Sequence, residues 1–275
     1  MKAFKRILYL GLGGYLIIII MLYFFQEKLI FLPTSLPQNY AYSFSEYFEE
    51  IFLTADDGAR LNALWFKKEN PKGLVLYFHG NAGNLARWGE ITIPFVRNGF
   101  DVLVMDYRTY GKSTGKLSED ALFSDAQLFY DFAVENYEED EIVLYGRSLG
   151  TGMATKLAAE NKPGQLLLET PYYSLLDIGV KRFPWLPVKW FMKYPMRNYE
   201  FVQEVSCPVR IFHGTEDKVV PYDSGLKLFD TIPLRNKVFH TIKGGGHNDL
   251  ATYPDFREAL ELSLFSDQSK SAEER

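Results

Sequence analysis

The hydrophobic positions of this 275-residue chain follow two kinds of pattern. Residues 7–25 form one apolar run without a charged side chain, whereas after residue 50 short apolar runs alternate with longer stretches of helical periodicity. Short continuous apolar runs are typical of strands that are buried on both faces of a sheet. Their alternation with helices predicts the α/β class, with a mostly parallel sheet covered by helices on both faces.

The predicted strands are rich in aliphatic and aromatic residues and are bounded by glycine, proline or polar residues. They span 50–53, 61–66, 73–78, 102–105, 142–145, 166–168, 209–212 and 238–242. The turn at 55–58 predicts that the first two strands form a hairpin. Helices are predicted over 85–98, 118–136, 151–160 and 253–265. We therefore expect one α/β domain over 50–266, followed by a polar tail over 267–275.

The apolar run 7–25 has the length of a membrane-spanning helix, which needs about 20 apolar residues. A signal peptide has a shorter apolar region and a cleavage site with small residues, and this sequence shows neither feature. An uncleaved transmembrane anchor is therefore favoured over a cleaved signal or a buried core helix. Because the flank 1–6 is basic, the positive-inside rule keeps it in the cytoplasm. The rest of the chain would then lie on the outer, periplasmic or extracytoplasmic side.

Two segments interrupt the regular alternation. Residues 26–49 form a connector, in which Pro33 and Pro37 oppose a continuous helix. Within it, the apolar stretch 29–32 is expected to lie on the membrane surface or to pack on the domain. Residues 171–205 form an insertion that is rich in aromatic residues and proline. A short cap over the neighbouring sheet edge is favoured, and the alternative is a loop with a small core of its own.

Composition and charge exclude several classes of protein. The net charge of −5 argues against a nucleic-acid-binding protein, which would carry an excess of basic residues. A hydrophobic content of 47% excludes a disordered chain. The single cysteine, Cys207, cannot form an internal disulfide and is expected to be a buried thiol. Because Arg87, Arg97 and Arg108 are scattered along the chain, we expect them on the solvated surface. No pair of histidines has the spacing of metal ligands, so neither a metal nor a cofactor is predicted.

The pentapeptide 146–150, Gly-Arg-Ser-Leu-Gly, lies between the predicted strand 142–145 and the predicted helix 151–160. In such a strand–turn–helix context, G-x-S-x-G places a serine on a tight turn with its hydroxyl exposed above the sheet. The flanking glycines let the strand and the helix approach each other closely. Ser148 is therefore the predicted nucleophile of an acyl-transfer site.

A serine nucleophile needs a base to accept its proton, and the base needs a carboxylate to orient it. Among the four histidines, His79 precedes the serine, His213 ends a predicted strand and His240 lies within one. His247 follows the last strand in a glycine-rich loop, which can reach the serine. His247 is therefore the predicted base, and the alternative is an ordinary loop histidine.

The acid is expected between the serine and the base in chain order. Asp217 lies in a loop after a predicted strand, at the carboxyl edge of the sheet where ligands bind in open α/β folds. Glu216 would point away if Asp217 points inward, and Asp223 suits the cap of the following helix. Asp249 follows His247 too closely to reach its far ring nitrogen. Asp217 is therefore the predicted acid.

The oxyanion of the tetrahedral intermediate needs two hydrogen-bond donors that are positioned in advance. The backbone N–H of Leu149, next to the nucleophile, is one candidate. The loop 79–84 should supply the other from Asn81, with Ala82 as a second candidate. The alternative for this loop is a plain glycine-rich turn between a strand and a helix.

These motifs together resemble the α/β-hydrolase superfamily, and more closely its membrane-anchored Bem46-like branch, which is related to ABHD-type serine hydrolases. The shared motifs are 79–84 (HGNAGN), 106–111 (DYRTYG), 146–150 (GRSLG), 213–217 (HGTED) and 246–249 (GHND). One departure is Thr109, because similar chains have glycine at this position. The resemblance implies cleavage of acyl thioesters or lipid esters.

The resulting hypothesis is a membrane-anchored serine hydrolase that cleaves carboxylic esters or thioesters through an acyl-serine intermediate. Its expected partners are the membrane and a small-molecule or lipid acyl substrate, without nucleic acid. Two alternative functions remain, one a different hydrolytic activity and the other without catalysis. The first is a serine peptidase or aminopeptidase on the same residues, for which Glu200 and Glu204 are weak candidates to bind an amine. The second is a non-catalytic membrane scaffold, which the complete Ser, Asp and His set disfavours.

Overall fold

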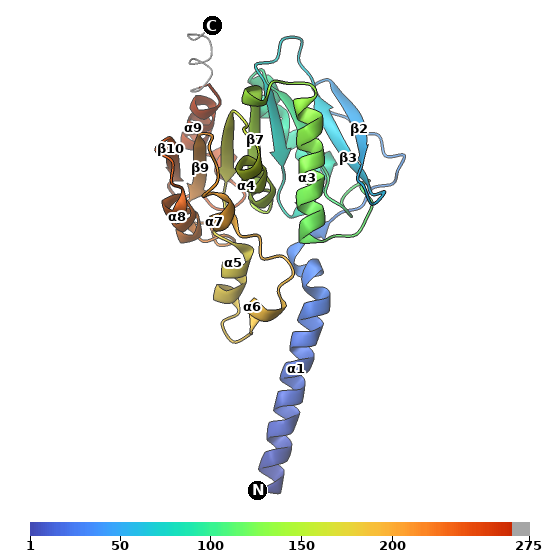
Figure 1. The fold of residues 1–275 in the computed structure, drawn as a ribbon, viewed down its shortest axis with the longest axis vertical. Coiled ribbons are helices and arrows are strands. Elements are labelled where there is room, and N and C mark those ends of the chain that lie inside the picture. The colour runs from blue at the N-terminus through green and yellow to red at the C-terminus, as the bar shows by residue number, and fades with distance from the viewer. Residues whose placement is uncertain (266–275) are drawn as a thin grey trace.

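The computed structural model describes residues 1–265 of the chain. A long N-terminal helix, α1 (Lys2–Ile30), leads into a domain built on an eight-stranded sheet (Figure 1). The strand order is β10-β9-β8-β7-β4-β6-β3-β2, and pairing is parallel from β10 to β6. β3 runs antiparallel to both of its neighbours, β6 and β2, and the β2–β3 pair is the predicted hairpin. The predicted α/β class is confirmed.

Each predicted strand corresponds to a strand of this sheet, with ends that differ by a few residues. The sheet consists of β2 (Phe48–Thr54), β3 (Arg60–Phe66), β4 (Leu74–Phe78), β6 (Asp101–Met105), β7 (Ile142–Arg147), β8 (Gln165–Glu169), β9 (Val209–Gly214) and β10 (Lys237–Ile242). A separate parallel pair joins β1 (Leu32–Pro33) to β5 (Ala82–Gly83). The helices of the domain are α2 (Leu85–Arg97), α3 (Glu119–Val134), α4 (Gly150–Glu160), α5 (Leu175–Arg182), α6 (Val188–Phe191), α7 (Asn198–Phe201), α8 (Tyr222–Thr231) and α9 (Pro254–Phe265), with short 3₁₀ turns η1 (Glu139–Glu141) and η2 (Leu250–Thr252).

Two hydrophobic cores lie on opposite faces of the sheet. In β4, Leu74, Leu76 and Phe78 belong to one core, which α3, α4 and α8 cover. Val75 and Tyr77 belong to the other, which α2 and α9 cover. Because side chains alternate between the faces of a strand, a strand buried on both faces is apolar at every position. This explains the continuous apolar run in the sequence.

Helix α1 extends away from the domain, and its length and composition suit a membrane span (Figure 1). It continues to Ile30, beyond the apolar run 7–25 and into the segment expected to be a connector. The part of α1 beyond residue 25 packs against the insertion 171–205, where the side chain of Gln26 is buried. Its side-chain Nε2 donates to the carbonyl of Phe191 (3.1 Å), and its Oε1 accepts from the N–H of Lys193 (2.8 Å).

The insertion at 171–205 contains α5, α6 and α7, which the sequence pattern did not predict individually. In Figure 1, α5 and α6 lie beyond the end of the sheet, on the same side as α1. The insertion therefore packs against the N-terminal helix as well as against the domain.

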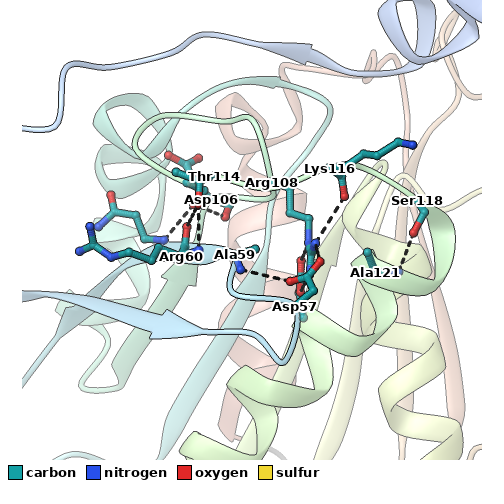
Figure 2. Close-up of polar contacts among 12 residues, drawn as sticks. Asp57, Ala59, Arg60, Asp106, Arg108, Thr114, Lys116, Ser118 and Ala121 are labelled. Carbon is teal, nitrogen blue, oxygen red and sulfur yellow. Dashed lines mark hydrogen bonds and ion pairs between the residues drawn. The ribbon is translucent and has the colours of Figure 1, made fainter.

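The expectation that Arg108 is solvated was wrong. Its side chain is buried, and its Nε and Nη2 donate to the carboxylate of Asp125 over 2.7 and 2.8 Å. Its Nη1 donates to Asp57 in the turn between β2 and β3 (Figure 2). Arg108 thus joins the β2–β3 turn to α3, with a buried contact to Asp125 and a contact to the exposed Asp57. By contrast, Arg87 and Arg97 are exposed, as expected.

The side chain of Cys207 is buried, as expected. The predicted polar tail 267–275 lies outside the described residues.

Candidate active site

Ser148 occupies a sharp turn between β7 and α4. Its φ of 50° is in the left-handed region, which is costly for a residue other than glycine. A Cβ at Gly146 would lie 2.7 Å from the carbonyl oxygen of Gly150, and one at Gly150 would lie 2.0 Å from that of Phe78. Both positions therefore require glycine. The motif predicted from the sequence has the strained geometry of a nucleophile elbow.

Two consecutive hydrogen bonds connect Ser148 to His247 and His247 to Asp217. The Nε2 of His247 lies 2.9 Å from the Oγ of Ser148, and its Nδ1 lies 2.7 Å from the Oδ2 of Asp217. The three side chains come from loops after β7, β10 and β9, which end at the same edge of the sheet. A neutral imidazole that donates from Nδ1 to the carboxylate leaves Nε2 free to accept the serine proton.

The Asp217 side chain is fully buried, where three hydrogen bonds and a longer contact with His213 hold it. Its Oδ1 accepts from the N–H groups of Val219 (2.8 Å) and Val220 (2.9 Å), and its Oδ2 faces His247. The Nε2 of His213 lies 3.4 Å from the same oxygen. Burial opposes ionisation, but the hydrogen bonds from His213, His247 and Val220 outweigh it and hold the pKa of Asp217 well below its usual range. The carboxylate therefore stays charged beside the imidazole.

The interaction of His213 with Asp217 is a site contact that the sequence analysis missed. His213 is buried at the end of β9, and its Nε2 also contacts the carbonyl of Val220 (3.0 Å). From its place in the sequence, His213 was compared with the other histidines only as a possible base. Its position at the end of a strand, four residues before the predicted acid, is the signal that could have identified it as a partner of the acid.

The other acidic candidates have different surroundings. Glu216 is exposed, as expected if Asp217 points inward. Asp249 accepts from the N–H of Gly246 (2.7 Å) and so shapes the loop that carries the histidine. Asp223 lies in the first turn of α8, but the N-cap there is Pro221, so the expected capping role was wrong.

Asn81 lies in the loop after β4 and borders the same cavity as Ser148 and Leu149. Its carbonyl accepts from the N–H of Leu32 (2.8 Å) and from the Oη of Tyr110 (2.6 Å). These contacts fix the backbone of the loop from two sides. That the N–H groups of Asn81 and Leu149 bind an oxyanion stays a prediction.

A cavity of roughly 380 Å³ adjoins Ser148. Its walls are mostly apolar and come from α1 and the insertion as well as from the loops at the sheet edge. Representative side chains are Leu22, Leu29 and Ile30 from α1, and Ile178, Leu186 and Met192 from the insertion. The insertion thus covers the sheet edge, as a cap does.

Comparisons with known proteins agree with this architecture. A family model described as serine aminopeptidase, S33, matches residues 69–193. An α/β-hydrolase domain-containing protein of Arabidopsis thaliana, WAV2, is 28% identical over 96% of this chain and 91% of its own length. This chain belongs to the α/β-hydrolase superfamily. An uncharacterised protein of Mycobacterium tuberculosis is also similar, with 30% identity over 82% of this chain and 81% of its own length.

Among solved structures, an esterase of Pyrococcus furiosus has a similar fold, with a TM-score of 0.68. The match covers 86% of this chain and 98% of the esterase at 19% identity, so it concerns the fold alone. The family model and the relative from Arabidopsis thaliana support a hydrolase, whereas the esterase supports the fold alone.

Proposed function

We propose that this protein is a membrane-anchored serine hydrolase that cleaves carboxylic esters or thioesters. The main support for the proposal is the pair of hydrogen bonds that connects Ser148 through His247 to Asp217. This arrangement supplies a nucleophile, a base and an orienting carboxylate, and it lies beside an apolar cavity.

In the proposed mechanism, the Oγ of Ser148 attacks the acyl carbonyl while Nε2 of His247 takes its proton. Asp217 stabilises the imidazolium that forms. The N–H groups of Leu149 and Asn81 stabilise the oxyanion, and His247 then protonates the departing alcohol or thiol. Water, activated by the same imidazole, attacks the acyl-serine and releases the acid and the free enzyme.

The cavity favours an acyl substrate over a peptide. Arg182 is the only charged residue among the described residues that line it, and an arginine cannot pair with a substrate amine. An aminopeptidase needs a carboxylate there, but Glu200 and Glu204 do not line the cavity. The aminopeptidase alternative is supported by the description of the matching family model. Parallel assays with acyl esters and amino-acid amides distinguish the two activities.

Membrane anchoring by α1 is part of the same proposal. The helix has the length and hydropathy of a span, and basic residues precede its apolar run. The flank 1–6 would then be cytoplasmic, and the hydrolase domain would lie on the outer side of the membrane. The variant Asp140→Cys, which places a thiol on η1 of the domain, tests the orientation. An impermeant thiol reagent should label this cysteine in intact cells if the domain lies on the outer side.

A fluorophosphonate probe applied to the full chain in detergent tests the catalytic proposal. The wild-type protein should be labelled and should hydrolyse acyl esters. The variant Ser148→Ala should show neither labelling nor hydrolysis. Ser206→Ala, which removes an exposed serine outside the cavity, is the matched control and should behave as wild type. A folded wild-type protein that is not labelled, or labelling that survives Ser148→Ala, would contradict the proposal.

A further inference from the structure

The N-terminal helix forms part of the wall of the cavity that contains Ser148. Leu22, Gln26, Leu29 and Ile30 of α1 all line this cavity. Leu22 also lies within the apolar run 7–25 that is long enough to cross a bilayer. The proposed membrane anchor and the proposed substrate cavity therefore share side chains.

Contacts between α1 and the cap continue along the helix toward its N-terminus. The Oη of Tyr15 donates to the carbonyl of Trp185 (2.8 Å), and the Oη of Tyr194 donates to Glu27 (3.0 Å). Between these contacts, Gln26 bonds to the backbone on both sides of Met192. At 1.5 Å per residue, Tyr15 and Glu27 are separated by about 18 Å along the helix axis. The cap thus lies beside much of the outer half of the apolar run.

The part of the cap that lies beside α1, residues 183–192, is called the cap tip. Its sequence, FPWLPVKWFM, contains one charged residue, Lys189. Three aromatic side chains on it are exposed: Trp190 (89%), Trp185 (60%) and Phe183 (40%). Exposed aromatic side chains gathered on one element mark an interaction surface, and tryptophan is enriched where proteins meet the membrane interface. The long stem of Lys189 can carry its ammonium group toward lipid headgroups.

We propose that the cap tip inserts into the outer leaflet beside α1 and that the cavity between them receives one acyl chain of a membrane lipid ester. The chain leaves the leaflet along the seam between α1 and the cap, with its ester carbonyl at Ser148. A cavity of roughly 380 Å³ is at the small end of the range for ligand sites, which fits a lipid with one acyl chain. This inference rests on the proposed hydrolase function, and it makes α1 a substrate-binding element as well as an anchor.

The first experiment reduces the space in the cavity by placing a larger side chain on the α1 wall. Full-chain Leu29→Trp is compared with wild type on dodecanoyl and acetyl esters in vesicles, and fluorophosphonate labelling reports on Ser148. The ratio of kcat/KM for the long ester to that for the short ester should fall roughly tenfold or more, because the indole obstructs the acyl path. Leu12→Trp, on the same helix but outside the cavity, is the control and should keep the wild-type ratio.

The outcomes of this experiment separate the two proposals. If the wild-type protein neither hydrolyses esters nor reacts with the probe, the proposed function fails. If it does both but Leu29→Trp keeps the wild-type ratio, α1 is not part of the acyl site and this inference is overturned.

The second experiment measures insertion of the cap tip directly. The full chain is reconstituted in vesicles whose lipids carry bromine on the acyl chains, which quench nearby tryptophans. Wild-type fluorescence should be quenched, and the variant Trp185→Phe/Trp190→Phe should lose this quenching, because Trp65 and Trp88 are buried in the domain. Equal quenching in both proteins would overturn the insertion. Unquenched tip tryptophans in a protein that sediments as a dimer would assign the tip to a second copy and would also overturn it.

Discussion

The carbonyl oxygen of Ile30, the last residue of α1, accepts a hydrogen bond from the side-chain amide of Asn81 over 2.9 Å. Two residues further on, the N–H of Leu32 donates to the carbonyl of Asn81. Both contacts connect the end of α1 to the loop that we propose as part of the oxyanion site. The position of that loop therefore depends on a helix that is distant from it in the sequence.

Replacement of Asn81 by alanine tests this connection. The variant keeps the backbone N–H but loses the bond to Ile30, so we expect a displaced oxyanion donor. Since one neutral hydrogen bond contributes about 1 kcal/mol, kcat on acyl esters should fall roughly fivefold to tenfold with little change in KM. Asn136→Ala removes a similar bond from an exposed part of the chain, to Phe132, and should leave kcat unchanged. A wild-type kcat in Asn81→Ala would show that this side chain does not position the loop.

The lowered pKa of Asp217 predicts how stability depends on pH. Its pKa in the folded protein is below its ordinary value of 3.8, because hydrogen bonds from His213 and His247 outweigh burial. Its contribution to the free energy of unfolding is therefore full above its unfolded pKa and is lost as the pH falls through its folded pKa. We expect the difference in unfolding free energy between wild type and Asp217→Asn to be largest above about pH 5 and to shrink below about pH 4.

Denaturant unfolding of both proteins between pH 3 and pH 7 measures this difference. Asp223→Asn, at an exposed position in α8, is the control and should differ little from wild type at any pH. If the difference between wild type and Asp217→Asn stays constant down to pH 3, hydrogen bonding to an ionised Asp217 does not stabilise the fold.

Local sequence patterns were sufficient to predict the sheet, and they also selected the three residues of the proposed site. Strands buried on both faces are recognisable because every position is apolar, as in β4. Loops that follow parallel strands meet at one edge of the sheet, so chain order was enough to select Ser148, Asp217 and His247. The structure places these three side chains within hydrogen-bonding distance.

What the sequence did not predict depends on contacts between distant segments. The bonds of Gln26 to the cap join residues about 165 positions apart, and no local pattern reports them. The burial of Arg108 likewise depends on Asp57 and Asp125, which reach it from two other elements. Single charged residues are usually exposed, so an isolated arginine such as Arg108 is expected on the surface when its partners are unknown.

Thr109 has a φ of 73°, in the left-handed region that favours glycine, the residue that the family resemblance implies at this position. Its buried Oγ1 has no hydrogen-bond partner in the described structure. Thr109→Gly should therefore raise the free energy of unfolding by about 1 kcal/mol, because the removal of strain and of an unsatisfied hydroxyl outweighs the added freedom of the unfolded chain. Thermal unfolding followed by circular dichroism measures the change.

Thr114→Gly is the matched control, because Thr114 is exposed and its Oγ1 accepts from the N–H of Arg60 (2.9 Å; Figure 2). The same substitution there should lower stability, since it removes a contact and adds freedom to the unfolded chain. A lower melting temperature for Thr109→Gly would contradict a strained threonine at this position.

The buried pair of Arg108 and Asp125 predicts a strongly asymmetric mutant cycle. Arg108→Met leaves the Asp125 carboxylate buried without its partner, so the free energy of unfolding should fall by about 3–5 kcal/mol. The double variant Arg108→Met/Asp125→Leu removes both charges and should regain much of that loss. Arg97→Met is the control, because Arg97 pairs with Glu46 on the surface and such pairs contribute about 0–1 kcal/mol. A loss in Arg108→Met no larger than in Arg97→Met, or a double variant less stable than Arg108→Met, would show that this pair does not hold the β2–β3 turn to α3.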